Sequence, residues 1–536
     1  MMGMDRPSFK DYFPLIGLLA ITFLTRLHFF FLVRHDPAFM MPIVDSLEYD
    51  IWAYRIATQN WLWDVLPYHL PAYPYFVAAI YKLGGYNVQV VALIQYVLAL
   101  GASTLTYFIA CKLTDRATAL IAVLFLAVYW FVIYLQTFLF AENLSLVFNC
   151  LLIFILLFMN ERPLKYALAG MVLGLSVAAR PDILVFACFF PLWLIIEQGF
   201  NKKTAAYYSI FLLGLSLVLA PIAMHNRQIS NEPVFLRTQV GVNMYIGNRP
   251  DFKGQAAVAI GKDWEEIISM PHKALQREVS ESESDAYFFN ETFKIIRAQP
   301  LVWLKFMGGK IFSILSGRDF LRSEDVYFYN RYVLHTPYYA VTTRLIFILF
   351  LAGLVLSLRA PKKFTLLYLF LLAESFIIFF QIKTRYLLPL FPFVLVFAGL
   401  ALHETWIALR RKETKKLLWT LAGLLLLSVA TLLNPLQIAA PNTAETYYAI
   451  AKNYAERSQW AQAKEHFEIA LVIDPSNVSA YNDLGLLEIH LGERARGCWL
   501  IAQALRLDPD AVKARLNYVA KCTPAESSMR KMQTGL

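Results

Sequence analysis

A short acidic stretch is the first place where this sequence could do chemistry. The segment DSLEYDIWAYRI, which begins at Asp45, holds the carboxylates Asp45, Glu48 and Asp50 within six residues. On a helix, Asp45 and Tyr49 would share one face, and a carboxylate there could accept a proton from a nucleophile or hold a metal ion. The alternative is a solvated acidic turn that the helix dipole stabilises, and spacing alone favours this second interpretation.

Basic residues in or beside apolar segments form the second group of candidates: Arg26, Arg180, Lys383 and Arg385. Fixed positive charge at a membrane surface can hold a phosphate group. The alternative is that the longer side chains simply reach toward the lipid headgroups. If the run around Arg26 crosses a membrane, that arginine costs roughly 2.5–3.5 kcal/mol on insertion scales, so a partner or a function is expected for it.

The composition of the chain indicates the elements that must position these residues. The 536 residues are 58% hydrophobic and 16% charged, with a mean hydropathy of +0.49. Soluble domains contain about 25% charged residues. This difference excludes a disordered scaffold, argues against an ordinary soluble enzyme and predicts a multi-pass membrane protein.

Eleven apolar segments are predicted to span the membrane as helices. The first has no cleavage site after it and is expected to be an uncleaved anchor. The short apolar run Pro71–Gly84 is predicted to be an interfacial helix, with its tyrosines in the headgroup region. The predicted spans are Tyr12–Val33, Val88–Lys112, Ala117–Leu135, Leu139–Met159, Ala167–Ala179, Ile183–Ile196, Ala205–Met224, Tyr338–Leu358, Phe364–Ile382, Tyr386–His403 and Leu417–Leu436.

The net charge of +10 comes from residues 1–440, because residues 441–536 contain 11 basic and 11 acidic side chains and are neutral. In residues 1–440 the surplus basic side chains lie between the apolar segments. Basic clusters beside apolar spans are the positive-inside signal rather than a nucleic-acid surface. This predicts an inner (plasma) membrane protein with a cytoplasmic N-terminus and no nucleic-acid partner. Loops 34–87 and 225–337 and the chain beyond Leu436 are then outside, provided that Trp303–Leu315 is an amphipathic surface helix.

Residues 444–477 and 478–511 repeat with a 34-residue period. Tyr447 aligns with Tyr481 and Ala470 with Ala504, and a proline ends each repeat. This pattern resembles a pair of tetratricopeptide repeats. We expect a domain at 441–524 with a capping helix at Ala511–Lys521, followed by a polar tail at 525–536. A disulfide between Cys498 and Cys522 would attach the last repeat to this cap on an oxidising side of the membrane.

Six short motifs in residues 12 to about 405 together resemble the GT-C glycosyltransferase superfamily, in the branch of protein O-mannosyltransferases and lipid A aminoarabinose transferases. They occur in the expected order and topology. They are Asp45-Ser46 with Tyr49, Pro71-Ala72-Tyr73-Pro74, Glu142, Ala179-Arg180-Pro181, the stretch from Gly241 to Asn248, and Arg385-Tyr386-Leu387-Leu388-Pro389.

The resemblance implies a role for each candidate residue. Asp45 matches the proposed catalytic base, and Glu142 matches an acidic residue that orients the acceptor or a metal ion. Ser46 stands where many relatives have a second acid, which directs attention to Glu48 and Asp50 as helpers. The basic residues Arg26, Arg180, Lys383 and Arg385 are expected to hold the donor phosphate. Tyr49, Asn243, Asn248 and His225 are expected on the acceptor side or in the outer loops.

These observations predict an all-α polytopic membrane protein with a transmembrane glycosyltransferase domain at 1–440 and a small extracytoplasmic α-solenoid. The resemblance implies transfer of a sugar from a polyprenyl-phosphate donor to an acceptor hydroxyl, with inversion, on the extracytoplasmic face. Residues 444–521 would recruit a protein or glycan acceptor, and a divalent metal ion is left open. The alternatives are transfer of a preassembled lipid-linked glycan, and a lipid flippase or transporter with a docking domain.

Overall fold

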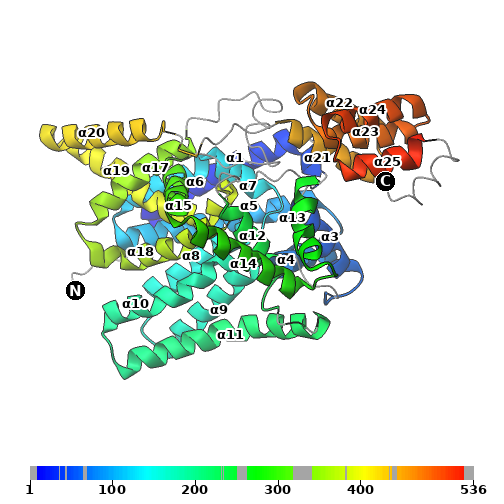
Figure 1. Ribbon diagram of the computed structural model, residues 1–536. Coiled ribbons are helices and arrows are strands. Elements are labelled where there is room, and N and C mark those ends of the chain that lie inside the picture. Colours follow the sequence, from blue (N-terminus) through cyan, green and yellow to red (C-terminus); the bar gives the residue numbers. More distant parts are fainter. Residues whose placement is uncertain are drawn as a thin grey trace.

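The computed structural model describes residues 9–35, 37–40, 42, 45–63, 69–230, 232, 234–249, 262–317, 341–380, 383–433, 435–436 and 443–523. Within these ranges every regular element is a helix (Figure 1). This confirms the predicted all-α class.

The membrane part begins with η1 (Phe9–Tyr12) and α1 (Phe13–Val33). Its further helices, in chain order, are α2 (Pro37–Met40), α3 (Asp45–Thr58), α4 (Ala72–Gly84), α5 (Val88–Leu113), α6 (Arg116–Val128), α7 (Trp130–Thr137), α8 (Glu142–Phe158), α9 (Pro163–Ala179), η2 (Pro181–Val185), α10 (Phe186–Gln198), α11 (Lys202–Ser230), α12 (Val240–Gly247), α13 (Lys262–Leu275), α14 (Glu281–Ala298), α15 (Pro300–Leu315), α17 (Thr343–Ser357), α18 (Pro361–Ser375), η6 (Phe376–Phe379), η7 (Thr384–Leu390), α19 (Phe391–Arg410) and α20 (Thr414–Ala430).

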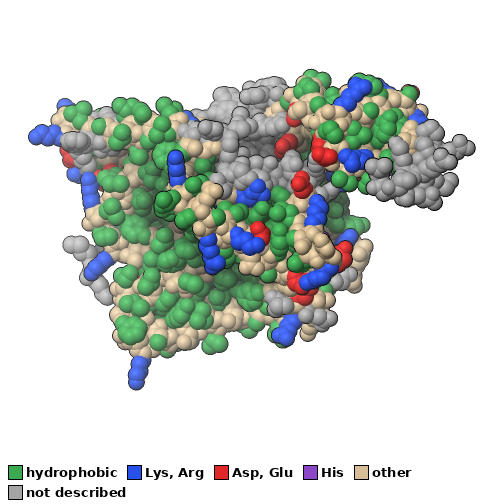
Figure 2. Space-filling view, viewed as in Figure 1, with side chains coloured by type: hydrophobic (Ala, Val, Ile, Leu, Met, Phe, Trp, Pro, Cys, Tyr) green, Lys and Arg blue, Asp and Glu red, His purple; other side chains and the backbone are tan. Residues whose placement is uncertain are grey.

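Five of these helical segments are long and apolar enough to cross a membrane by themselves. A sixth forms if α6 and α7, which are bent by 56° at Tyr129, are counted as one span. The helices α8, α9 and α17 are apolar but shorter. Each of the eleven predicted spans overlaps a helix, and apolar side chains cover much of the visible face of the bundle (Figure 2). The chain is therefore a multi-pass membrane protein.

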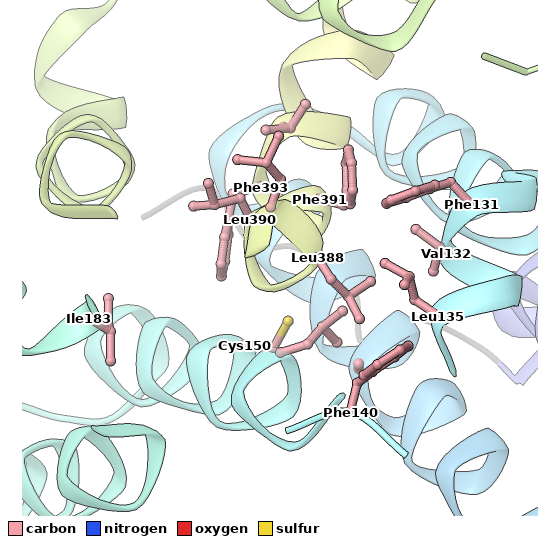
Figure 3. Close-up of a cluster of buried hydrophobic side chains, with 14 of the residues drawn as sticks. Phe131, Val132, Leu135, Phe140, Cys150, Ile183, Leu388, Leu390, Phe391 and Phe393 are labelled. Atoms are coloured by element: carbon pink, nitrogen blue, oxygen red, sulfur yellow. The ribbon is translucent and has the colours of Figure 1, made fainter. Parts of the chain in front are cut away.

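The core of the bundle forms where α7 meets the start of α19. Phe391 packs edge-on against Tyr129, with ring centroids 5.1 Å apart. Figure 3 shows Phe131 and Leu135 of α7 facing Leu388 and Phe391. Apolar contacts of this kind hold the segment after Lys383 firmly against the rest of the bundle.

The predicted interfacial helix exists as α4, but its tyrosines do not all lie at the headgroups. Tyr73 is fully buried and donates a hydrogen bond to Gln95 of α5 at 2.7 Å. Tyr81 is also buried, and α4 packs along α3. The expectation for Tyr73 and Tyr81 was wrong, because α3 and α5 cover the face of α4 that composition alone assigned to the membrane surface.

The C-terminal part consists of two helix pairs and a final helix: α21 (Thr443–Glu456), α22 (Trp460–Ile473), α23 (Val478–His490), α24 (Arg494–Leu507) and α25 (Val512–Cys522). Within each pair the two helices pack together, and α25 packs on the second pair. These are the predicted α-solenoid and its cap.

Gly497 and Glu488 of the second repeat differ from the residues typical of a tetratricopeptide repeat, and both differences have clear physical reasons. A Cβ on Gly485 would lie 2.7 Å from the carbonyl oxygen of Gly497, so both glycines allow α23 and α24 to approach closely. The buried carboxylate of Glu488 is paired with Lys464 at 3.0 Å and Arg496 at 3.2 Å. The predicted disulfide between Cys498 and Cys522 is present.

Candidate active site

Asp45 begins α3 and lies in a cluster of buried charges. Its carboxylate forms an ion pair with Arg385 and lies 3.5 Å from the Nζ of Lys383. The next residue, Ser46, donates a hydrogen bond to the carbonyl oxygen of Leu139 at 3.0 Å. The serine that replaces a second acid therefore fixes the start of α3 to the loop before α8.

Glu142, at the start of α8, connects two of the arginines. Its Oε1 accepts a hydrogen bond from Arg180 at 2.5 Å and lies 3.4 Å from the Nε of Arg385. All three side chains are almost completely buried. The sequence-predicted residues Asp45, Glu142, Arg180, Lys383 and Arg385 are thus brought together from four segments of the chain.

Arg385 is held in place by the apolar character of its own segment. It lies in η7, whose Leu387, Leu388 and Leu390 are buried in the core (Figure 3). Its guanidinium also lies 4.8 Å from the ring centroid of Phe140, a favourable cation–π position. The periodic leucines thus fix one side of η7 and direct the arginine toward Asp45.

Sequence reasoning missed a second carboxylate behind Arg180. Asp182 accepts a hydrogen bond from the Nε of Arg180 at 3.0 Å, so this guanidinium lies between two carboxylates. The Arg180 guanidinium also stacks over the ring of Tyr386 at 4.2 Å. Asp182 directly follows the motif Ala179-Arg180-Pro181, and this proximity was the available signal, whereas Tyr386 belongs to the motif that begins at Arg385.

Buried Lys310 anchors the segment that precedes Lys383. Its ammonium group donates to the carbonyl oxygens of Gly247 at 2.7 Å and Phe380 at 3.0 Å, and also to that of Ile378. It therefore joins α12, α15 and the end of η6. Lys310 lies in Trp303–Leu315, the predicted amphipathic surface helix, and the sequence does not indicate this role because its carbonyl partners are distant in the chain.

The surrounding charges decide the protonation of Asp45. Burial by itself would raise its pKa, but Arg385, Lys383 and His69 outweigh this effect and hold the pKa well below the usual range. Burial would lower the pKa of Arg180, whereas Asp182 and Glu142 raise it above its usual value. The resting site therefore holds an ionised carboxylate among ionised cations.

Glu48 and Tyr49 lie at the border of the cluster. A carboxylate oxygen of Glu48 lies 2.8 Å from the Nε2 of His69, and Glu48 is half exposed. The ring of Tyr49 lies 4.2 Å from the His69 ring. Burial, Glu142 and Asp45 raise the pKa of the Tyr49 hydroxyl well above its usual value, so this tyrosine is a neutral hydrogen-bonding group.

A cavity of about 770 Å³ opens beside the cluster. Its lining includes Tyr49, Arg180, Asp182 and Tyr386, together with apolar side chains of η2, α10, η6 and residues 234–236. Small-molecule pockets typically combine a largely apolar lining with a few polar groups and have volumes of roughly 300–1,000 Å³. The cavity suits a ligand with a charged or polar part and an apolar part.

Two predicted site residues have their hydrogen bonds elsewhere. Asp50 accepts hydrogen bonds from Tyr81 at 2.5 Å and Tyr86 at 2.8 Å, on the opposite side of α3 from the cluster. Arg26 is buried between α1 and α7, where it donates to Gln136 at 2.8 Å and to two backbone carbonyls. The structure therefore does not bring Asp50 or Arg26 into direct contact with the charge cluster, because local spacing does not determine which side of a helix is covered.

The three outer-loop candidates are also dispersed. Asn243 lines the cavity, with its amide donating to the Gln239 carbonyl at 2.7 Å. Asn248 bridges α12, α15 and η6, accepting from Trp303 at 2.9 Å and donating to the Phe379 carbonyl. His225 contacts the Trp63 carbonyl at 2.9 Å. Only Asn243 of these three borders the candidate site.

A divalent metal ion was left open by the sequence. Over the ranges that the structure describes, no group of three or more His, Cys, Asp or Glu side chains has the arrangement of a metal site. The nearest candidate ligands, Asp45 and Glu142, are engaged by Lys383, Arg385 and Arg180.

Residues 68–224 match the family model described as dolichyl-phosphate-mannose-protein mannosyltransferase. The matched segment runs from the residues before α4 to α11 and includes both Glu142 and Arg180. Over these residues the chain is similar to the mannosyltransferase family that the sequence motifs indicated. The buried charge cluster is the candidate active site, since it joins the matched residues Glu142 and Arg180 to Asp45, Lys383 and Arg385.

Two crystal structures of the Archaeoglobus fulgidus oligosaccharyltransferase align with this chain. The apo form has 14% identity and a TM-score of 0.44, and the form tethered to an acceptor peptide has 12% and 0.43. Each alignment covers 85% of this chain but only 60% and 59% of the other, so the chain spans about three fifths of that enzyme. No conclusion rests on these alignments, because both TM-scores are below 0.5. No curated protein sequence matches the chain.

Proposed function

We propose that this protein is a glycosyltransferase that moves a sugar from a polyprenyl-phosphate donor to an acceptor hydroxyl, with inversion at the sugar carbon. The observation that carries the proposal is the meeting of Lys383, Arg385 and Arg180 with Asp45 and Glu142 beside the cavity. A phosphate leaving group needs fixed positive charge, and a hydroxyl nucleophile needs a base. This cluster contains both.

The donor phosphate would be held by Lys383 and Arg385. In the resting site both cations face Asp45, and Arg385 also approaches Glu142. An arriving phosphate oxygen would compete with these carboxylates for the same N–H donors. As the bond between the sugar carbon and the phosphate oxygen breaks, the electron pair remains on that oxygen, and the two cations stabilise the resulting charge.

Asp45 would act as the base. The acceptor oxygen attacks the sugar carbon from the face opposite the phosphate, and its proton passes to the Asp45 carboxylate. In the resting site Asp45 is a weak base, because Arg385 and Lys383 hold its pKa low despite its burial. A donor phosphate that draws these cations away would raise the proton affinity of Asp45 only when the substrate is present.

Glu142 would keep Arg180 and Arg385 at a fixed separation. It contacts both guanidinium groups from a buried position at the start of α8. A preorganised cluster of this kind costs no reorganisation when charge develops in the transition state. Glu142 would therefore position the phosphate-binding groups rather than exchange a proton.

The same proposal places the site and the repeats on the extracytoplasmic side. The disulfide between Cys498 and Cys522 supports this side, since such bonds persist in oxidising compartments. The repeats at residues 444–521 would recruit the acceptor, because stacked helix pairs offer extended surfaces for binding other molecules.

Transfer of a preassembled lipid-linked glycan is the second candidate. The same phosphate-binding groups would serve it, and the half-exposed Glu48 borders the cluster from the side of solvent. A flippase is the candidate from another class. It is less well supported, because the buried charges gather in one cluster where the α3, α8 and η7 segments begin, rather than in two symmetric halves.

One reconstituted assay tests the function. The purified protein in liposomes would be given polyprenyl-phosphate carrying a radiolabelled monosaccharide, and released and transferred sugar would be measured. We expect slow donor hydrolysis in the wild-type protein and none with Asp45→Asn. Movement of intact donor between the leaflets without cleavage would instead support the flippase, and cleavage only of oligosaccharide-loaded lipid would support glycan transfer.

A further inference from the structure

The first repeat contacts Pro42, which lies just before α3, the helix that begins with Asp45. Asn453, in the last turns of α21, is almost completely buried and donates a hydrogen bond to the carbonyl oxygen of Pro42 at 2.6 Å. Pro42 comes three residues before Asp45, although 411 residues separate Pro42 from Asn453. Figure 1 shows α21 where the repeats meet the membrane part.

A second interaction involves residues that follow Asp45 in the sequence. Arg457 follows α21 directly, and its Nε donates to the side-chain oxygen of Asn453 at 3.2 Å. The positive charge of Arg457 also acts electrostatically on the Asp50 carboxylate and the Tyr86 hydroxyl group. Arg457 therefore joins Asn453 to the group of side chains around Asp50.

Asp50 is the residue of α3 on which the charge of Arg457 acts. It is buried, and its two carboxylate oxygens accept hydrogen bonds from Tyr81 at 2.5 Å and Tyr86 at 2.8 Å. Five residues of α-helix separate it from Asp45, which is about 7.5 Å along the helix axis. A shift of Asp50 therefore moves the Asp45 end of the same rigid helix by a comparable amount.

We propose that the first repeat is a positioning element of the active site, in which Asn453 and Arg457 hold the chain at Pro42 and Asp50 and so set the place of Asp45 relative to Arg385. The inference rests on the proposed function, since it assigns Asp45 as the base. Asp50 is then a positioning residue rather than a catalytic helper. The domain that would recruit the acceptor also holds the catalytic helix.

This arrangement has a consequence for deletion of the repeats. A domain that only recruited acceptor would affect transfer and leave donor hydrolysis unchanged. A domain that also positions Asp45 affects both reactions, because donor hydrolysis uses the same base with water as the acceptor. Removal of residues 441–536 is therefore expected to lower both rates.

Point variants in the full chain provide the sharper experiment. Asn453→Ala and Arg457→Ala remove the two contacts, Arg457→Lys keeps the charge, and Arg506→Ala removes an exposed arginine from α24 as the matched control. Small displacements of a catalytic group can cost up to roughly 100-fold in rate. We expect kcat for donor hydrolysis to fall roughly 5- to 50-fold with Arg457→Ala, with the donor KM little changed, and Arg457→Lys to restore most of the rate.

The pH profile separates positioning from general loss of structure. If Asp45 moves away from Arg385 and Lys383, its pKa rises, because these cations are what lower it. The acidic limb of kcat/KM for donor hydrolysis should then move to higher pH with Asn453→Ala and Arg457→Ala, but not with Arg506→Ala. Unchanged rates and an unchanged limb in both variants would overturn the inference.

A measurement without substrate distinguishes failure of this inference from failure of the proposed function. Hydrogen–deuterium exchange of the peptide covering residues 45–58 should become faster in the Arg457→Ala protein and stay at the wild-type rate in the Arg506→Ala protein. Equal protection in all three proteins would contradict the docking, whatever the enzymatic activity. Faster exchange in the Arg457→Ala protein, together with a wild-type protein that cleaves no lipid-phosphate sugar, would support the contact between the first repeat and α3 and reject the proposed function.

Discussion

Asp45 at the start of α3 and Arg385 at the start of η7 form a buried ion pair across 340 residues of sequence. The pair joins the start of α3 to the segment between α18 and α19. Because Arg385 also approaches Glu142 at 3.4 Å, the base and the phosphate-binding groups form one unit. A substitution at any member therefore changes the environment of the others.

Asp45→Asn should abolish transfer while the protein still inserts and folds. The amide keeps the volume of the carboxylate but cannot accept a proton at neutral pH, so the loss should be at least about 100-fold, as expected for a general base. Sugar transfer from a polyprenyl-phosphate donor would be measured beside thermal unfolding of the purified protein. Full activity in this variant would remove Asp45 from the catalytic role.

Arg385→Lys and Arg385→Ala should differ in a graded way. Lysine keeps the charge but loses the planar fork that contacts Asp45 and Glu142 together, so the rate should fall by roughly 10-fold and the donor KM should rise. Alanine should remove nearly all activity, since it also leaves Asp45 with a weaker set of cations. Equal kinetics for the two variants would mean that Arg385 does not hold the phosphate.

Glu142→Gln should destabilise the protein as well as slow it. The substitution leaves Arg180 and Arg385 buried with less negative charge around them, and breaking a buried pair typically costs roughly 3–5 kcal/mol. Asp182 still contacts Arg180 at 3.0 Å, so the cost should lie at the lower end. A thermal unfolding midpoint equal to that of the wild type would show that Glu142 is not needed to hold the arginines.

The ion pairs of Asp45 predict how stability depends on pH. Its pKa is lower in the folded protein than in the unfolded chain, so its contribution is complete above the usual value near 4 and is lost as the pH falls through the folded value. Asp45→Asn should therefore reduce the unfolding temperature at about pH 7, and this difference should shrink on acidification. Glu48→Gln, at a half-exposed position, is the control.

The disulfide predicts both stability and sidedness. Cys498→Ser together with Cys522→Ser should destabilise the second repeat by about 2–4 kcal/mol, and a reducing agent should lower the unfolding temperature of the wild-type protein only. A membrane-impermeant thiol reagent applied to intact cells should label Cys498→Ser at Cys522. Protection from this reagent would contradict the extracytoplasmic position of the repeats.

The sequence by itself determined the features that depend on local pattern. Apolar runs predicted the helices of the membrane part, and a 34-residue period predicted α21 to α25. These predictions were confirmed because hydrophobic and repeat periodicity are encoded within a few turns of chain. Motif resemblance selected Asp45, Glu142, Arg180, Lys383 and Arg385, which the structure brings together, and their roles stay predictions.

Only the tertiary structure decided which polar groups meet. It paired Arg26 with Gln136, turned Asp50 toward two tyrosines, placed Asp182 behind Arg180 and brought Asn453 to Pro42. Each of these contacts depends on how helices far apart in sequence pack and on which face of each helix becomes covered. A buried polar group needs a hydrogen-bonding partner, and packing decides which group that is. The residues next to it in the sequence do not identify this partner.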